Sequence, residues 1–167
     1  DMWWIVLVAL AVYEALKPFC KNKDLQIKWP NDIISHNKKL CGILCERVSE
    51  YTVIGIGVNI NDENFTGEIE NKATSLYLLN GKKYRQKEIF DLLCASFENV
   101  FEKHDFKFTQ KAKEEYEKLC ANFGKNVFTK NIFGEAVGIG ADGSLLIKAE
   151  DGLHIVSSGE VAVHNIY

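Results

Sequence analysis

The sequence lacks an excess of basic residues. Its 20 lysines and arginines are outnumbered by 23 aspartates and glutamates, which gives a formal net charge of -3 at pH 7. Charges of both signs alternate along the chain without a long block of one sign. A protein that binds nucleic acid through its phosphates usually carries a basic patch or stripe. The charge pattern therefore argues against a nucleic-acid partner.

A hydrophobic run long enough to cross a membrane is also missing. The most apolar stretch, residues 2–13, is followed closely by Glu14 and Lys17. It is shorter than the roughly 20 apolar residues that a transmembrane helix needs. It also lacks the basic start and the small-residue cleavage site of a signal peptide. We expect a buried helix here and no membrane partner.

Cysteine and histidine show no metal-binding pattern. The chain has five scattered cysteines, and the closest pair, Cys41 and Cys45, is separated by three residues, a spacing that fits no zinc signature. The four histidines have no ligand-like spacing to one another. We therefore expect no zinc site built by the protein, and reduced thiols in a cytoplasmic protein.

The hydrophobic pattern predicts an α/β (α+β) protein with a mixed, largely antiparallel sheet and covering helices. With 167 residues and 47% hydrophobic content, the chain can bury a substantial core. A helix apolar on nearly every side, and therefore buried beneath a sheet, is expected at residues 3–17. The alternating and β-branched runs predict strands at 24–29, 32–36, 39–48 and 51–60. Further helices are expected at 75–79, 86–104 and 110–119.

The character of the sequence changes after Asn122. Glycines there punctuate short runs of valine, isoleucine and phenylalanine, and Asp142-Gly143 and Asp151-Gly152 are turn pairs. Five short strands in about 45 residues are typical of a small SH3-like barrel. We therefore expect two domains, a core at residues 1–121 and an SH3-like domain at residues 122–167.

The most informative segment is Lys28-Trp29-Pro30-Asn31-Asp32, followed by the residues 38–44 with the sequence KKLCGIL. Proline and asparagine break the first strand, and the polar pair Asn37-Lys38 turns the chain back. Asn31, Asp32 and Lys39 should then share one end of the sheet. An amide, a carboxylate and an ammonium grouped in this way suit a ligand that carries phosphate.

These two segments, together with Gly55-Ile56-Gly57-Val58-Asn59, resemble the catalytic core of the biotin protein ligases in order and spacing. Each segment alone is a weak signal, whereas the three together are specific. The resemblance implies that ATP activates biotin, with Mg²⁺, to biotinyl-5'-AMP. A lysine of the biotin carboxyl carrier domain of a carboxylase then displaces AMP. It also implies the same core fold and the SH3-like domain.

The resemblance gives catalytic roles to two residues. Lys39 would be the fixed cation between the biotin carboxylate and the α-phosphate, and the alternative is a solvated turn lysine like its neighbour Lys38. Asp32 would position Mg²⁺ or accept the proton of the acceptor lysine. A turn-forming aspartate or a salt bridge to Lys39 is the alternative for Asp32.

The resemblance also implies contacts to the ligands. Asn31 would contact the nucleotide or simply form the turn, and Trp29 would flank the nucleotide or belong to the core, with Lys28 as its solvent-facing neighbour. Glu160, in a turn of the barrel, would face the site or be solvated. Asn59 would contact adenine or a phosphate. The residues expected to form a wall against biotin are Gly42, Ile43, Leu44, Gly55 and Gly57.

Two departures from the family pattern leave other readings open. The opening strand and Gly/Arg-rich loop that close over biotin are not found before the first helix, so Asp1 is expected to be internal to a longer protein. Residues 72–76 contain no aromatic residue to stack on adenine. The alternatives are a lipoate-attaching enzyme, a fragment that only binds nucleotide or an acceptor protein, and a module that serves only for interaction. The sequence also leaves open whether the protein forms a homodimer.

Overall fold

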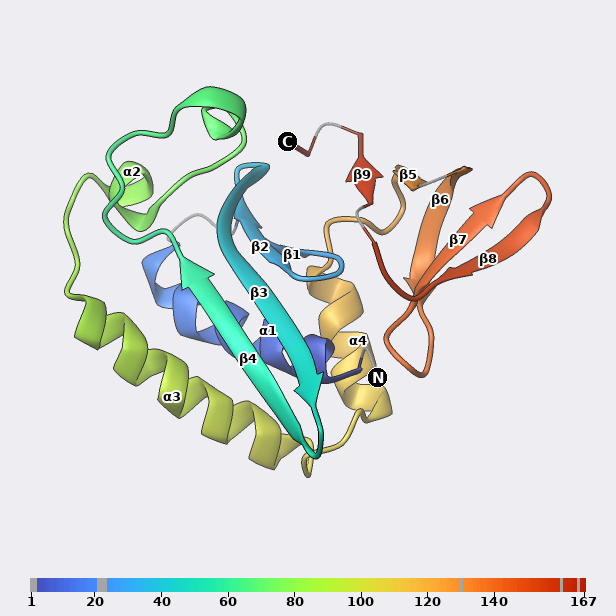
Figure 1. Ribbon diagram of the computed structural model, residues 1–167, viewed down its shortest axis with the longest axis horizontal. Helices are drawn as coiled ribbons and strands as arrows, with labels where there is room; N and C mark the ends of the chain where they lie inside the picture. The colour runs from blue at the N-terminus through green and yellow to red at the C-terminus, as the bar shows by residue number, and fades with distance from the viewer. Residues whose placement is uncertain (1–2, 21–23, 130, 160, 165) are drawn as a thin grey trace.

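The computed structural model contains two antiparallel sheets, and helices cover one face of the first (Figure 1). It describes residues 3–20, 24–129, 131–159, 161–164 and 166–167. The first sheet has the spatial order β1 (Leu25–Lys28), β2 (Asp32–Ser35), β3 (Lys38–Val48), β4 (Tyr51–Val58). The second has the order β8 (Gly152–Val156), β7 (Leu145–Ala149), β6 (Ile132–Ile139), β5 (Asn126–Thr129), β9 (Ala162–Val163).

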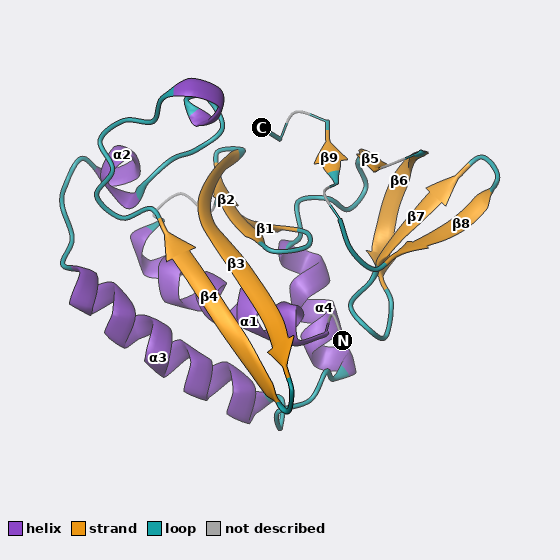
Figure 2. Cartoon of the chain, in the orientation of Figure 1, coloured by secondary structure: helices purple, strands orange, loops and turns teal. Residues whose placement is uncertain are grey.

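One helix precedes the first sheet, and the other helices lie between the two sheets in the chain order (Figure 2). They are α1 (Trp3–Leu16), the 3-10 turns η1 (Lys17–Phe19) and η2 (Gly67–Ile69), α2 (Leu76–Asn80), α3 (Gln86–Lys103) and α4 (Gln110–Leu119). The mixed α/β class, the helices and the strands of the first sheet are thus as predicted, within two residues at each end. The five short strands predicted after Asn122 are confirmed as well.

Helix α1 is the centre of the first core. It packs against β1, β2 and β3 and between α3 and α4. Every side chain from Ile5 to Leu16 except Glu14 is buried, as its apolar sequence predicts. Pro18 stands at the start of η1, where the α-helix gives way. In the part of the chain that the structure describes, no helix is both long and apolar enough to span a bilayer.

Local capping fixes the shorter helices. The Ser75 hydroxyl accepts a hydrogen bond from the backbone N–H of Leu78 at 3.0 Å and begins α2. Gly81 ends α2 in the left-handed conformation, with φ of 66°. The Thr109 hydroxyl caps α4 in the same way, at 3.1 Å from the N–H of Ala112. The caps set where α2 and α4 begin, while the N–H groups of Leu76 and Tyr77 donate to the carbonyls of Asn59 and Ile60 and hold α2 beside the end of β4.

The register of the first sheet puts one row of residues on its open face. Lys28 pairs with Asp32, Asp32 with Gly42, and Gly42 with Gly57. Directly paired residues project from the same face of a sheet. Ile33 and Ile43, one position along, are buried on the other face, where the sheet packs on α1. The Lys28–Asp32–Gly42–Gly57 row therefore faces away from the helices.

The second sheet is tied to the edge of the first. The N–H of Ala121 donates to the carbonyl of Ile27 at 2.8 Å, and the N–H of Trp29 donates to the side chain of Asn122 at 2.8 Å. The Trp29 indole N–H donates to the carbonyl of Gly143 at 3.0 Å. These bonds cover part of the outer edge of β1.

Candidate active site

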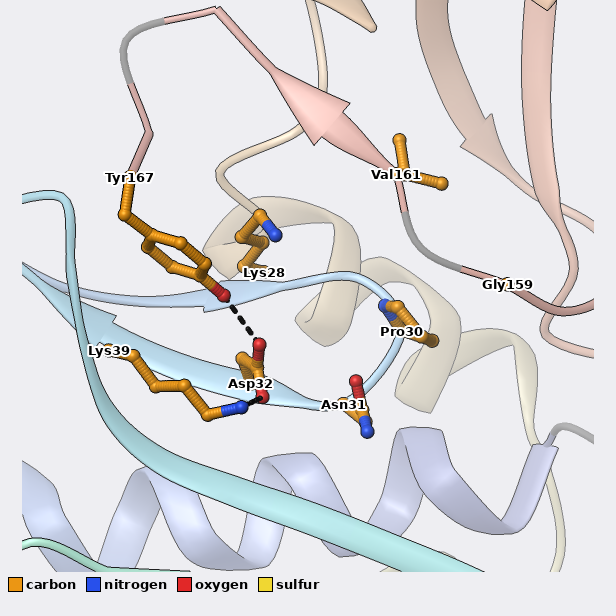
Figure 3. Close-up of a pocket in the computed structure, with 8 residues that line it drawn as sticks. All are labelled: Lys28, Pro30, Asn31, Asp32, Lys39, Gly159, Val161 and Tyr167. Atoms are coloured by element: carbon orange, nitrogen blue, oxygen red, sulfur yellow. Dashed lines mark hydrogen bonds and ion pairs between the residues drawn. The ribbon is translucent and has the colours of Figure 1, made fainter. Parts of the chain in front are cut away.

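A pocket of about 410 Å³ opens where the two sheets meet (Figure 3). Its lining combines the β1–β2 turn and the start of β3 with the chain that follows β8. The described lining residues are Lys28, Pro30, Asn31, Asp32, Lys39, Gly159, Val161 and Tyr167. Three residues that the sequence predicted to share one end of the sheet, Asn31, Asp32 and Lys39, are therefore brought together.

Lys39 and Asp32 form an ion pair in this pocket. The Lys39 ammonium lies 2.6 Å from Oδ1 of Asp32. The Asp32 side chain is 12% exposed and that of Lys39 is 42% exposed, so the lysine remains open to a ligand. The Lys39 backbone is fixed on its other side, because its N–H donates to Lys72 at 2.8 Å and its carbonyl accepts from Thr74 at 2.9 Å.

Gly42 makes room for this ion pair. The Lys39 side chain runs along β3 and crosses over Gly42 to reach Asp32. A Cβ atom at Gly42 would lie 3.1 Å from Cε and 3.2 Å from Nζ of Lys39, and 3.6 Å from Oδ1 of Asp32. A methyl group at this position would make Lys39 move by a few tenths of an ångström, so the glycine favours this geometry of the pair. Its role as part of a ligand wall stays a prediction.

The second oxygen of Asp32 has a partner that the sequence did not reveal. The Tyr167 hydroxyl donates to Oδ2 of Asp32 at 2.5 Å. The Lys28 ammonium lies 4.3 Å from the centroid of the Tyr167 ring, within cation–π range. Lys28 is only 5% exposed, so its interpretation as a solvent-facing neighbour of Trp29 was wrong.

Asn31 locks the turn that carries Asp32. Its side-chain amide donates to the carbonyl of Ile43 at 2.7 Å, and the N–H of Ile43 donates to the carbonyl of Asn31 at 2.8 Å. These reciprocal bonds hold the start of β2 against β3. Asn31 thus acts as the turn residue that the sequence allowed, while its side chain also lines the pocket.

A strip without side chains continues from the ion pair along the open face. Gly57 lies opposite Gly42, and Gly55 lies opposite Leu44. A Cβ at Gly57 would meet only the carbonyl of Gly42, at 4.0 Å. Leu44 is 55% exposed beside this strip. The arrangement is a flat floor with one apolar side chain, which suits the close approach of a ligand to backbone groups.

The side chain of Ile43 belongs to the core and is not part of this floor. It is 2% exposed and faces α1, because neighbouring strand residues alternate between the two faces. Only the backbone of Ile43 can therefore meet a ligand on the open face.

Trp29 and Asn59 hold structural positions. Trp29 is fully buried with its indole bonded to Gly143, which matches the core alternative left open for it. The Asn59 amide donates to the carbonyl of Thr74 at 3.0 Å and fastens residues 72–76 next to Lys39. Asn59 thus helps to place Lys39, and the predicted ligand contacts of both residues stay predictions. Glu160 lies outside the described residues.

Cys41 lies next to Gly42 but is not a nucleophile. Burial raises the pKa of its thiol to about 12, with a further increase from Asp32 and an opposing effect of Lys39. Since the thiolate is the reactive form, the thiol is inert at neutral pH. None of the five cysteines forms a disulfide.

Asp32 is the one acidic side chain among the described lining residues of the pocket. Within the described ranges no group of three or more His, Cys, Asp or Glu side chains could enclose a metal ion. A site with one carboxylate fits Mg²⁺ that is held mainly by substrate phosphates, since Mg²⁺ commonly uses one or two protein carboxylates in this way.

Two protein-family models match the chain. Residues 2–61 match the "Biotin/lipoate A/B protein ligase family", and residues 128–163 match the "Biotin protein ligase C terminal domain". Among curated proteins, the chain is 28% identical to the bifunctional ligase/repressor BirA of Bacillus subtilis over 93% of its length, which is 51% of that protein. It is 29% identical to the biotin--[acetyl-CoA-carboxylase] ligase of Paracoccus denitrificans, over 93% of this chain and 70% of that protein.

Solved structures give the same result. The crystal structure of biotin protein ligase from Aquifex aeolicus matches with a TM-score of 0.89 and 30% identity, over 98% of this chain and 75% of that one. The complex of that protein with biotin and ATP matches with a TM-score of 0.85 and 29% identity, over 98% and 71%. The chain nevertheless spans only about half the length of the BirA proteins, 51% in each of two Bacillus species.

Proposed function

The chain belongs to the biotin protein ligase family, and we propose that it carries the catalytic centre of an enzyme that attaches biotin to protein with ATP. The observation that carries this proposal is the Lys39–Asp32 ion pair at the end of the glycine floor. A cation, a carboxylate and a surface without side chains are what the activation of a flat, carboxylate-bearing ligand by a nucleotide requires.

In the first step, biotin lies on the floor formed by Gly42, Gly55 and Gly57, beside Leu44. Its carboxylate attacks the α-phosphate of ATP, the bond to pyrophosphate breaks, and biotinyl-5'-AMP forms. Lys39 stands where both anions must meet. Its ammonium offsets their repulsion and stabilises the negative charge that develops on the α-phosphate.

In the second step, the amine of an acceptor lysine attacks the acyl carbon of biotinyl-AMP and AMP leaves. The attacking amine must lose a proton, because a lysine side chain has a reference pKa of ~10.4. Asp32 is the described carboxylate in the pocket that can take this proton. Its ion pair with Lys39 holds the carboxylate at the edge of the pocket.

Mg²⁺, when bound with ATP, would neutralise charge on the phosphates. Asp32 would be its protein ligand, and each of its oxygens retains a lone pair beyond the bonds to Lys39 and Tyr167. Asn31 holds the β1–β2 turn and so keeps Asp32 in place for either role.

The partner of the second step is proposed to be the biotin carboxyl carrier domain of a biotin-dependent carboxylase, in the cytoplasm. The support is the likeness to the Paracoccus denitrificans protein, whose name specifies acetyl-CoA carboxylase. Free cysteines throughout the chain agree with a reducing compartment.

The test is product identification with the whole protein. Biotin, ATP and Mg²⁺ should give biotinyl-AMP and pyrophosphate, detected by mass spectrometry, and a carrier domain added afterwards should gain one biotin. A parallel reaction with lipoate in place of biotin tests whether the chain is a lipoate-attaching enzyme, since the first family model covers both biotin and lipoate ligases. Lipoyl-AMP as the main product, or no adenylate at all, would contradict the proposal.

A further inference from the structure

Tyr167 reaches the site from the far side of the pocket (Figure 3). Its segment follows β9 and is anchored by Ile166, which is 2% exposed and whose N–H donates to Val163 at 3.1 Å. The N–H of Tyr167 donates to the carbonyl of Asn37, in the β2–β3 turn, at 3.3 Å. The residue is therefore held by both sheets.

The side chain of Tyr167 makes two contacts with the same row of the first sheet. Its hydroxyl donates to Oδ2 of Asp32, and its ring lies against the ammonium of Lys28. Lys28 and Asp32 are direct cross-strand partners. One tyrosine thus bridges the second sheet to the carboxylate and to its buried neighbour.

We propose that Tyr167 is a positioning residue of the biotinylation reaction and acts through Asp32. The inference rests on the proposed function, because Asp32 is its effector. Lys39 fixes one oxygen of the carboxylate and Tyr167 fixes the other, so the plane of the carboxylate is set from both sides. The terminal torsion of an aspartate is otherwise broad.

Through Tyr167, the second sheet helps to orient a side chain of the active site. Asp32 needs a fixed orientation to act on the reactants, and one of the two groups that fix it comes from the chain after β9. The second sheet therefore contributes to catalysis through one hydrogen bond, beyond its packing on β1 and Trp29.

Tyr167→Phe in the whole protein isolates this bond. The variant keeps the ring over Lys28 and removes only the hydroxyl. Transfer of biotin from preformed biotinyl-AMP to the carrier domain should become about 10-fold slower, the order expected for one hydrogen bond to a charged group. KM for the carrier domain should stay near the wild-type value, and a thermal melt should show that the variant remains folded.

Tyr51→Phe is the matched control. Tyr51 begins β4 and is 75% exposed, and the loss of its hydroxyl should leave the transfer rate unchanged. A rise in KM without a fall in kcat for Tyr167→Phe would indicate a docking role and overturn the proposal. Wild-type rates for Tyr167→Phe would overturn it as well.

A double-mutant cycle shows whether the effect passes through Asp32. In an Asp32→Asn background, Tyr167→Phe should change single-turnover transfer by less than about 2-fold, because the group on which it acts is gone. An undiminished loss in that background would overturn the proposal while leaving the proposed function intact. Absence of biotinyl-AMP from the wild-type protein would refute the proposed function itself, and the inference with it.

Discussion

Gly42→Ala should slow adenylate formation without unfolding the protein. The new methyl group would stand 3.1 Å from Cε and 3.2 Å from Nζ of Lys39, tighter than carbon contacts normally are. These atoms are the end of a flexible side chain, so Lys39 can move aside by a few tenths of an ångström. The substitution should therefore disturb the ion pair with Asp32 and leave the hydrogen bonds of the sheet intact.

The size of the effect follows from that displacement. Removal of a fixed charge at a reacting centre costs ~100-fold or more in rate, and a misplacement of about 1 Å can cost ~100-fold. A shift of a few tenths of an ångström, with the charge still present, should lower adenylate formation by about 10-fold. The free energy of unfolding should change by less than about 1 kcal/mol, as for most substitutions outside the core.

Pyrophosphate release under saturating biotin and ATP measures the first quantity, and urea unfolding measures the second. Gly57→Ala is the control, because its methyl group would have no protein atom nearer than the Gly42 carbonyl at 4.0 Å. It should raise KM for biotin by covering the floor, with kcat less affected. If Gly42→Ala retained wild-type kcat, the crossing of Lys39 over Gly42 would have no part in the reaction.

Three further outcomes are expected. Asp32→Asn should slow transfer from preformed biotinyl-AMP while the fold persists, since the amide keeps the shape and loses the charge; unchanged adenylation and transfer rates would make Asp32 a turn residue only. Gly134→Ala should destabilise the second sheet by about 1–3 kcal/mol, because its methyl group would collide with the backbone of β7; an unchanged urea midpoint would contradict this. Iodoacetamide at about pH 8 should label exposed Cys94 and spare Cys41 and Cys120, because burial raises the pKa of both thiols to about 12 and removes the reactive thiolate. Equal labelling in intact-mass spectra would show that the core opens.

The sequence predicted that Lys39 and Asp32 share one end of the sheet, because the pairing of a hairpin leaves few other arrangements. The ion pair between them is the alternative that the sequence left open for Asp32, and its role in the reaction stays a prediction. Pro30 breaks the strand, the turn before Lys39 reverses it, and strand pairing then brings Lys39 to Asp32. The burial of α1 was predictable as well, because a helix that is apolar on nearly every side is stable only when it is buried on all sides.

Other features depend on contacts between distant segments. The alternation of apolar and polar residues in β1 predicts that Lys28 points away from α1. The pairing of β1 with β2 across the Pro30-Asn31 turn also makes its position beside Asp32 predictable. Its burial could not be predicted, since the cover comes from Tyr167, 139 positions later in the chain. Trp29 is similar: its partner Gly143 lies in the second sheet, and no local pattern specifies that contact.

The most direct test of the account compares Lys39→Ala with Lys38→Ala in the whole protein. The two lysines are neighbours on β3, but only the Lys39 ammonium is paired with Asp32 in the pocket. Biotin-dependent pyrophosphate release should fall by ~100-fold or more for Lys39→Ala and stay at the wild-type rate for Lys38→Ala. Equal rates for the two variants would contradict the assignment of this pocket as the place where biotin is activated.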